Sequence, residues 1–455
     1  MRYTLALAVD SGQPRATASV SCRTGCMRHS ACVPRAHTRP VSWACITCVS
    51  VASFTQGLTR GGRVKTRCYL CFLLVVGFTA ACADSTAPDS PLVADLGRND
   101  VRARDPQALG VTAMTRNLYI GADVDVVIAA LASPDPADDV PTLLDAIAVL
   151  QHTDFPTRAE ALADEIARPR PDVIGLQEVE QLHIDLTSLG LPVAINQNFL
   201  AILGAALARR GLHYAVAGRV TNVTAFLLSG AINLTDEDVI LVNADRVTVL
   251  PGVAAHTYST NLGVVAPGVE LKRGWVQIDA LIGGERITVA STHLESGSNT
   301  TPAFPALRAA QATELVASVG AAPRAILLGD FNDTEGSPMY GVVTGAGFTD
   351  TWARLRPGVA GLTCCEPPDL SNPLPLLFER IDYVFARGLE GPDGALHGRI
   401  AVVGNRPGDR VPGPAYLIWP SDHAGVVARL RDRETNVAAS VARWASEAGG
   451  VRERP

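Results

Sequence analysis

Residues 324–338 read RAILLGDFNDTEGSP, a short aliphatic run that ends in a cluster of acids and an amide. An apolar run bounded by glycine predicts a buried strand, although Gly-Asp and Asn-Asp are also common turn dipeptides. If the strand continues, Asp330 and Asn332 lie on one face and Phe331 on the other, because side chains alternate along a strand. The stretch would then present a carboxylate and an amide together at the end of a rigid element.

Strand and helix patterns surround this stretch without a strict βαβ order. Helical spacing of apolar residues predicts helices within 155–171, 198–211 and 303–319. Apolar strand patterns occur at 109–120, 172–180, 214–218, 238–243, 275–282, 286–292, 325–331, 380–388 and 424–430. This mixed order predicts one α+β domain spanning 109–431, interrupted by two extra segments at 121–153 and 353–378.

Polar residues stand at the ends of these predicted strands: Asn117, Glu178, His293, Asp330, Asn332, Asp382, Asp422 and His423. Each alone has a structural explanation, such as a turn, an exposed strand-end acid or a helix cap. Their repetition at strand ends predicts that they converge at one edge. Amide and carboxylate oxygens suit Mg²⁺ or Mn²⁺ better than zinc, and histidines carry protons near neutral pH. Phosphodiester hydrolysis needs groups of these kinds.

The ordered motifs TRNL, GLQEVE, STHLES, GDFND, RIDYVF and SDHAG resemble the endonuclease/exonuclease/phosphatase superfamily, which has the deoxyribonuclease-I-like fold. The resemblance covers about residues 110–430. It implies a four-layer α/β/β/α sandwich with the site where the two sheets open. It also implies an Mg²⁺- or Mn²⁺-dependent hydrolase of phosphoric ester bonds.

The resemblance assigns roles to individual residues. The implied metal ligands are Glu178, with Asn117, Asp330 and Asp422. The implied catalytic residues are His293, Asp330, Asn332, Asp382 and His423. Asp382 would orient His423, and the two histidines are interchangeable as general base and phosphate ligand. The implied substrate-binding residues are His293, Asn332 and Arg273, and for Arg273 a plain surface arginine is the alternative.

The resemblance leaves the substrate open. A nuclease acting outside the cytoplasm on nucleic acid is favoured, and a phospholipid or sphingomyelin phosphodiesterase is the alternative. A third alternative is a surface lipoprotein that keeps the fold as an inactive binding module. Nothing in the sequence implies a protein partner, and a monomer is expected.

Residues 64–82 read VKTRCYLCFLLVVGFTAAC, with the basic, apolar and small-residue regions of a signal peptide. A cysteine directly after the small residues resembles a bacterial lipobox. Cys82 is therefore expected to be lipidated and to anchor the protein to a bacterial membrane, with an ordinary cleaved signal peptide or a short buried helix as the alternatives. Residues 82–108 are polar and proline-containing and predict a tether, and 432–455 predict a C-terminal helix and tail.

Residues 1–63 do not fit a signal peptide that begins at 64. We expect them to lie outside the mature protein, as the product of an upstream start codon. From Cys82 onward the chain holds 29 basic and 44 acidic residues, a net charge of −15. An overall acidic protein attracts polyanions only through local basic clusters.

Cys364 and Cys365 are neighbours between the GDFND and RIDYVF motifs. The expected signal peptide implies an oxidising compartment. The hypothesis is a disulfide between them that stiffens a loop at the rim of the site, and the alternatives are two free thiols or a bond to one of the upstream cysteines.

Overall fold

The computed structural model describes residues 110–391 and 393–431. The predictions for 1–63, for the signal peptide at 64–81, for the tether at 82–108 with its lipidation at Cys82, and for 432–455 lie outside the described residues. Within the described ranges, no helix combines the length and apolar character needed to cross a bilayer.

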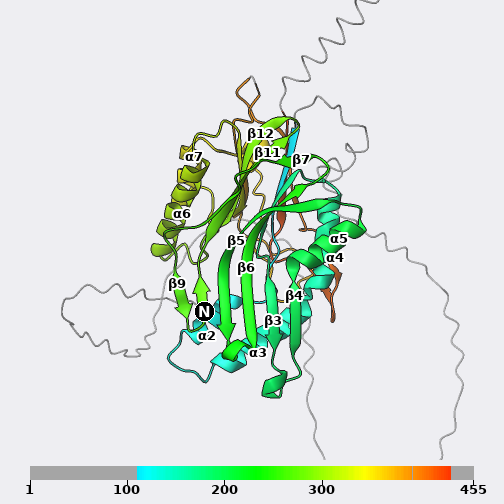
Figure 1. Ribbon diagram of the computed structural model, residues 1–455, viewed down its shortest axis with the longest axis vertical. Coiled ribbons are helices and arrows are strands. Elements are labelled where there is room, and N and C mark those ends of the chain that lie inside the picture. The colour runs from blue at the N-terminus through cyan, green and yellow to red at the C-terminus, as the bar shows by residue number, and fades with distance from the viewer. Residues whose placement is uncertain (1–109, 392, 432–455) are drawn as a thin grey trace, which may run out of the picture. The chain divides into compact units, whose positions relative to one another are not determined.

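Two β-sheets lie face to face at the centre of the domain (Figure 1). The larger sheet has ten strands in the order β16-β19-β1-β2-β6-β5-β10-β9, with β3 beside β6 and β4 beside β3. Its strands are β1 (Gly110–Asn117), β2 (Val173–Gln177), β3 (Gln181–Asp185), β4 (Ala194–Asn198), β5 (Tyr214–Leu227), β6 (Ile232–Asn243), β9 (Gly263–Ala266), β10 (Val269–Leu271), β16 (His397–Val403) and β19 (Gly425–Arg431).

The smaller sheet has seven strands in the order β14-β15-β13-β12-β11-β7, with β8 beside β11. Its strands are β7 (Val247–Val249), β8 (Ala254–Thr257), β11 (Gly274–Ile282), β12 (Glu285–His293), β13 (Ala325–Asp330), β14 (Thr349–Asp350) and β15 (Asp382–Arg387). A separate two-stranded ribbon pairs β17 (Val411–Pro412) with β18 (Leu417–Ile418).

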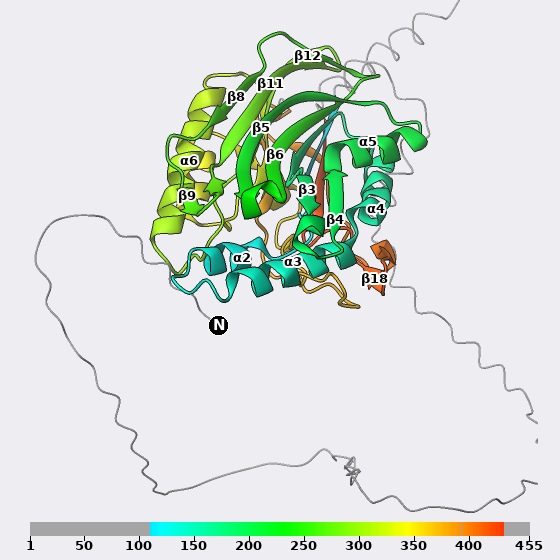
Figure 2. The same cartoon turned by 60° about the horizontal axis from the view of Figure 1, so that its bottom comes forward.

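Helices cover the outer faces of the two sheets (Figure 2). The larger sheet carries α2 (Val124–Leu131), α3 (Asp139–Thr153), α4 (Phe155–Ala167) and α5 (Phe199–Arg209), and the smaller carries α6 (Ala303–Val319) and α7 (Pro338–Gly345). Shorter elements are α8 (Thr351–Leu355), η1 (Thr187–Leu189), η2 (Leu228–Gly230) and η3 (Pro407–Asp409).

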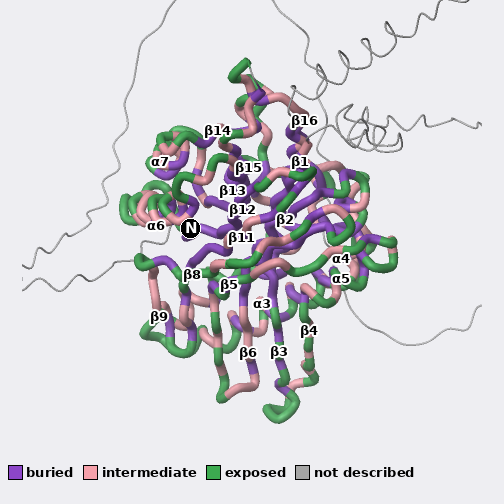
Figure 3. Tube along the Cα trace, turned by 45° about the horizontal axis from the view of Figure 1, so that its top comes forward, coloured by how far each residue is buried: buried purple, intermediate pink, exposed green. Residues whose placement is uncertain are grey.

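Three apolar cores hold these layers together, one between the sheets and one under each helical layer. The core between the sheets joins Val173 and Ile240 of the larger sheet to Ile278 and Leu328 of the smaller. Figure 3 shows that buried residues concentrate in the central strands. The predicted four-layer α/β/β/α sandwich is therefore confirmed.

The pairing register brings the polar strand ends to one edge. Parallel pairing of β1 with β2 sets Asn117 beside Gln177, the residue before Glu178. Parallel pairing of β12 with β13 sets His293 beside Asp330, and antiparallel β15 starts with Asp382 beside the same Asp330. The predicted convergence of these residues is confirmed.

Local details differ from the prediction at Asn332. The strand β13 ends at Asp330, and Asn332 adopts a φ of 51°. Alternation along a strand therefore does not place the two side chains on one face. The Asn332 backbone N–H donates to Asp330 Oδ1 at 2.9 Å, and its side-chain Nδ2 donates to the Leu294 carbonyl at 2.9 Å. A tight turn thus replaces the expected strand continuation.

Gly175 on β2 marks a close approach of the two sheets. A Cβ there would lie 2.6 Å from Ser291 Oγ and 2.8 Å from Leu328 Cβ on the facing sheet. On α5, a Cβ at Gly204 would meet nothing within 4 Å.

We predict opposite effects for the same substitution at these two glycines. Gly175→Ala should lower the free energy of unfolding by about 1–3 kcal/mol, because overpacking must push the sheets apart. Gly204→Ala should raise it by about 0.5–1 kcal/mol, because alanine favours an open helical position. Denaturant unfolding of both variants measures the difference. Equal effects would show that the sheets do not meet at Gly175.

Candidate active site

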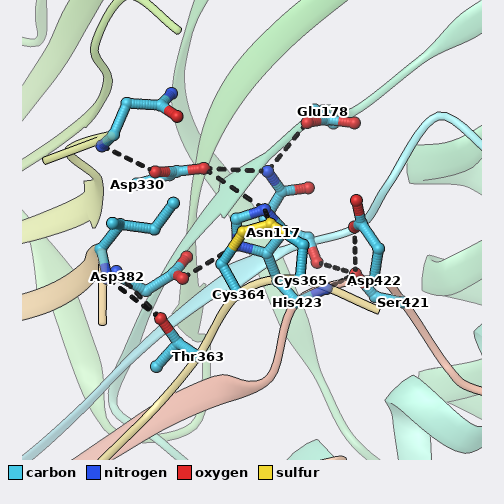
Figure 4. Close-up of a disulfide and its surroundings, with 12 residues drawn as sticks. Asn117, Glu178, Asp330, Thr363, Cys364, Cys365, Asp382, Ser421, Asp422 and His423 are labelled. Carbon is cyan, nitrogen blue, oxygen red and sulfur yellow. Dashed lines mark hydrogen bonds and ion pairs between the residues drawn. A yellow bond between two sulfur atoms is a disulfide. The ribbon is translucent and has the colours of Figure 1, made fainter. Parts of the chain in front are cut away.

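Asp330, at the end of β13, lies at the centre of the polar cluster (Figure 4). Its Oδ2 lies 3.6 Å from His293 Nε2 and 3.7 Å from His423 Nε2. The same oxygen accepts a hydrogen bond from Asn117 Nδ2 at 3.3 Å. The side chain is only 2% exposed, so this carboxylate is surrounded by the two imidazoles and the amide.

Glu178 reaches the same amide from the larger sheet. Its Oε1 accepts from Asn117 Nδ2 at 2.9 Å, and its Oε2 accepts from the Ile120 backbone N–H at 2.8 Å. The backbone of Glu178 has a φ of 53° directly after β2. A left-handed conformation costs a non-glycine residue about 1–3 kcal/mol and is held only where surrounding contacts fix it. At Glu178 these contacts are the hydrogen bonds of its own carboxylate, which lies in the polar cluster.

His423, in the loop before β19, and Asp382, at the start of β15, form a buried pair. His423 Nδ1 lies 2.9 Å from Asp382 Oδ2, which leaves Nε2 facing Asp330. The Asp382 backbone N–H donates to Thr363 Oγ1 at 3.2 Å, which ties β15 to the loop before it. Burial alone would lower the pKa of His423, but Asp382, Asp422 and Asp330 together raise it well above its usual value. Asp382 therefore orients the ring and favours its protonated form.

The other titratable groups are shifted mainly by burial. Burial raises the pKa of Asp330 to about 7, with Asp382 as the next cause, and His423 opposes the rise. Burial also raises the pKa of Asp422 to about 7. Burial, Arg273 and His423 hold the pKa of His293 well below its usual value. The two histidines thus favour opposite charge states near neutral pH.

The donor set fits a hard divalent cation. Oxygens of Glu178 and Asp330 converge on one neutral amide nitrogen of Asn117. Burial raises the pKa values of the Asp330 and Asp422 carboxylates although the charge of His423 opposes the rise, so a bound cation would further stabilise their ionised forms. Asp330, Asp382 and His423 also offer ligand atoms within 4.8 Å of one another. Carboxylate oxygens are ligands that Mg²⁺ prefers, whereas the Asn117 amide oxygen, predicted as a further ligand, accepts from the Tyr119 backbone N–H at 2.9 Å.

Asp422, which the sequence predicts as a further ligand, lies at the rim of this cluster. Its Oδ1 lies 3.4 Å from Ser421 Oγ, and its backbone carbonyl accepts from the Glu366 N–H at 2.8 Å. The charge of Glu178 contributes to its raised pKa. The side chain is near the Glu178 carboxylate, while its backbone belongs to the loop that carries His423.

Arg273 is 6% exposed, so the surface-arginine alternative is wrong. Its Nε lies 3.6 Å from Glu295 Oε1. Arg273 lines one cavity together with Glu178 and His293. A buried guanidinium beside these two residues is placed to meet a phosphate oxygen.

Two buried arginines that the sequence did not single out hold the loops of the site. Arg158 on α4 donates to the carbonyls of Leu118 at 2.6 Å, Tyr119 at 2.9 Å and Pro420 at 3.1 Å. Removing such a donor would leave several buried carbonyls unsatisfied. In the sequence, Arg158 interrupts the apolar face of its helix, and that irregularity was the available signal.

Arg116 on β1 likewise holds the loop that carries His423. Its Nη1 donates to the His423 backbone carbonyl, and its Nε lies 3.0 Å from Glu165 Oε2. It therefore fixes the backbone that carries His423.

Cys364 and Cys365 form a disulfide, which confirms the hypothesis of a bonded pair. Cys365 Sγ lies 3.9 Å from His423 Nε2 (Figure 4). The neighbouring Thr363 carbonyl accepts from the Ala424 N–H at 2.7 Å, so the loop also pairs with the His423 loop. The bonded pair borders the imidazole edge that faces Asp330, and the proposed stiffening of a substrate loop remains a hypothesis.

The sequence profile of the Endonuclease/Exonuclease/phosphatase family matches residues 150–423, more than half of the chain. The chain belongs to the endonuclease/exonuclease/phosphatase family. Members of this family are hydrolases that act on phosphoester bonds and generally use a divalent metal. The polar cluster of this family member lies at the strand ends of its two sheets.

Several solved structures are similar to this family member at low identity. An endonuclease/exonuclease/phosphatase from Beutenbergia cavernae is 21% identical, with 71% of each chain covered and a TM-score of 0.45. A family protein from Bacteroides thetaiotaomicron is 15% identical, with 72% of this chain and 96% of that chain covered and a TM-score of 0.45. The human Nocturnin catalytic domain with bound sulfate is 16% identical, with coverages of 70% and 93% and a TM-score of 0.42. A search of curated proteins finds no match.

We predict that Asp382→Asn lowers the pKa of His423. The substitution removes the carboxylate charge that most strongly favours the protonated ring while keeping a similar shape. An NMR titration of the imidazole nitrogens measures the change. Asp245→Asn, at an exposed acid elsewhere on the surface, serves as the matched control. An unchanged His423 titration in Asp382→Asn would rule out the pairing.

Proposed function

We propose that this family member is a divalent-metal-dependent phosphodiester hydrolase. The observation that carries the proposal is the buried Asp330 carboxylate between two imidazole Nε2 atoms, joined to Glu178 through one Asn117 amide. Such a cluster can hold a cation, an attacking water and a phosphate within one small volume.

Each side chain has a part in this proposal. Glu178 and Asp330 would hold the metal, with Asn117 orienting both carboxylates and Asp422 completing the ligand set. A bound Mg²⁺ or Mn²⁺ would supply positive charge where the transition state gathers negative charge.

The remaining residues would bind the phosphate and move protons. His293 and Arg273 would contact the non-bridging oxygens, and Asn332 would support Asp330 through its turn. His423, oriented by Asp382, would exchange a proton at Nε2 with the attacking or leaving oxygen. All the residue types expected of an active enzyme are present, which disfavours an inactive binding module.

The proposal also covers the substrate and the cellular location of the enzyme. The sequence favours a nuclease outside the cytoplasm, anchored by lipid on Cys82, with a phospholipid phosphodiesterase as the second candidate. The second candidate has support from the apolar cavity that Arg273, Glu178 and His293 border. A plain phosphodiester and a DNA substrate therefore need to be tested side by side.

We expect the full-length protein with Mg²⁺ or Mn²⁺ to hydrolyse bis(p-nitrophenyl) phosphate and to stop when EDTA is added. Asp330→Asn and Glu178→Gln should each lower kcat by about 100-fold or more, because each removes a charge that positions the metal. Asp135→Asn, at an exposed acid, is the matched control and should retain activity. Supercoiled plasmid in the same assay tests the nuclease prediction.

The outcomes distinguish phosphodiester hydrolysis in general from the hydrolysis of DNA in particular. Turnover of the synthetic diester with intact plasmid would remove DNA as substrate and leave the phosphodiesterase standing. Full activity in EDTA, or in both site variants, would contradict the proposed chemistry.

Metal affinity should fall as the pH decreases below about 7. Asp330 and Asp422 each have a pKa of about 7 without metal, and a proton competes with the cation for a carboxylate. Between pH 7 and pH 6 the apparent Kd for Mn²⁺ should rise by about fivefold for each carboxylate. Calorimetric titration measures the apparent Kd for Mn²⁺ at each pH, and Asp330→Asn should weaken its pH dependence. A pH-independent Kd would exclude these carboxylates as ligands.

A further inference from the structure

A second feature beside the polar cluster is an aliphatic cavity of about 160 Å³. The extra segment 121–153 forms one wall, with Val127 and Ile128 on α2 and Ile147 on α3. The opposite wall consists of strands β3, β5, β6 and β10 of the larger sheet. Figure 2 shows α2 and α3 running along the same part of this sheet.

The cavity is continuous with the candidate active site. Glu178, Arg273 and His293 line its polar end, and these are the residues proposed to meet metal and phosphate. A phosphoester bound at those side chains would therefore extend a substituent directly into the aliphatic part.

The walls do not have the chemistry that nucleic acids need. Among the described residues that line the cavity there is no Phe, Tyr or Trp on which a base could stack. Four acidic residues line it against one arginine, Arg273. Such a lining repels a polyanion and offers a base few hydrogen bonds.

An alkyl chain fits the same walls. Moving an alkyl chain from water onto apolar walls is favourable, and the volume holds on the order of ten water-sized spheres. Val124 on α2 lines the cavity and is 37% exposed, and the neighbouring Asp125 also lines it and is exposed. The cavity is thus open to solvent at α2, where a chain can enter.

We propose that the cavity binds an alkyl or acyl substituent of the substrate, so that the enzyme hydrolyses amphiphilic phosphodiesters of the lipid class. The proposal rests on the phosphodiesterase activity proposed above and names its substrate class. Hydrolysis itself balances without further reactants: water adds to phosphorus, the ester P–O bond breaks, and the leaving oxygen takes a proton. The apolar substituent contributes binding and positioning alone.

The test uses the full-length protein with Mg²⁺ and a series of p-nitrophenyl phosphodiesters whose second ester is methyl, butyl, hexyl or octyl, all kept below their aggregation limits. The expected result is a rise in kcat/KM of about fourfold per added methylene until the cavity is filled. Release of p-nitrophenol follows every member by the same signal.

Two variants on α3 locate the binding. Ala146 lines the cavity, whereas Ala148 on the same helix is exposed and outside it. Ala146→Phe should reduce the ratio of octyl to methyl kcat/KM to about one, because the ring fills the space. Ala148→Phe, the matched control, should keep the ratio of the unaltered protein. Circular dichroism of both variants verifies folding.

The results separate the two proposals. If no ester of the series is hydrolysed, the phosphodiesterase proposal fails. If methyl and octyl esters are hydrolysed with equal kcat/KM by the unaltered protein, only the cavity assignment fails, and that result needs no variant. A chain-length dependence that survives in Ala146→Phe would also overturn the cavity assignment, since the chain would then bind elsewhere.

A second assay with natural lipids tests whether the substrate is taken from a bilayer or from micelles. Vesicles of phosphatidylcholine and the micelle-forming single-chain lysophosphatidylcholine carry the same head group. Release of choline, in which the acyl-bearing ester stays on phosphorus as in the synthetic series, or of phosphocholine, in which it leaves, supports the lipid class, and the preferred form identifies whether the substrate is drawn from a membrane. Release from neither, together with chain-independent turnover of the synthetic esters, contradicts the proposal.

Discussion

The site depends on one costly arrangement, the burial of the Asp330 carboxylate at the junction of the two sheets. A buried carboxylate without a compensating charge is unfavourable, which its raised pKa of about 7 reflects. The surrounding structure stabilises it through Asn117, the Asn332 turn and the nearby imidazoles. Each of these groups comes from a different strand end, so the carboxylate can be held only when both sheets are assembled.

The loops around that carboxylate are fixed by buried arginines rather than by apolar packing alone. Arg158 joins the loop after β1 to the loop before β19 through their backbone carbonyls. Arg116 holds the carbonyl of His423 itself. Several good hydrogen bonds offset the desolvation of a guanidinium, and losing one partner of such a network costs about 3–5 kcal/mol. Both arginines therefore act on the chemistry through the backbone.

The extra segment 121–153 adds two helices, α2 and α3, next to the candidate site. In the sequence it is only an interruption between a strand and a helix. In the structure its helices α2 and α3 turn apolar side chains toward the larger sheet, next to Glu178 and His293. In this family member the candidate site thus borders an apolar space, and in our proposal the substituent on the phosphate becomes a second basis for selection.

The sequence by itself determined the α+β class, the strand ends that carry Asn117, Glu178, His293 and Asp330, and the family. Those features follow from local periodicity and from short motifs, which are properties of neighbouring residues. The helix at 303–319 was predicted to the residue for the same reason. Only the tertiary structure decided the turn at Asn332, the burial of Arg273, the roles of Arg116 and Arg158, and the cavity under α2 and α3. These depend on contacts between segments far apart in the chain, and periodicity carries no information about which distant surfaces meet.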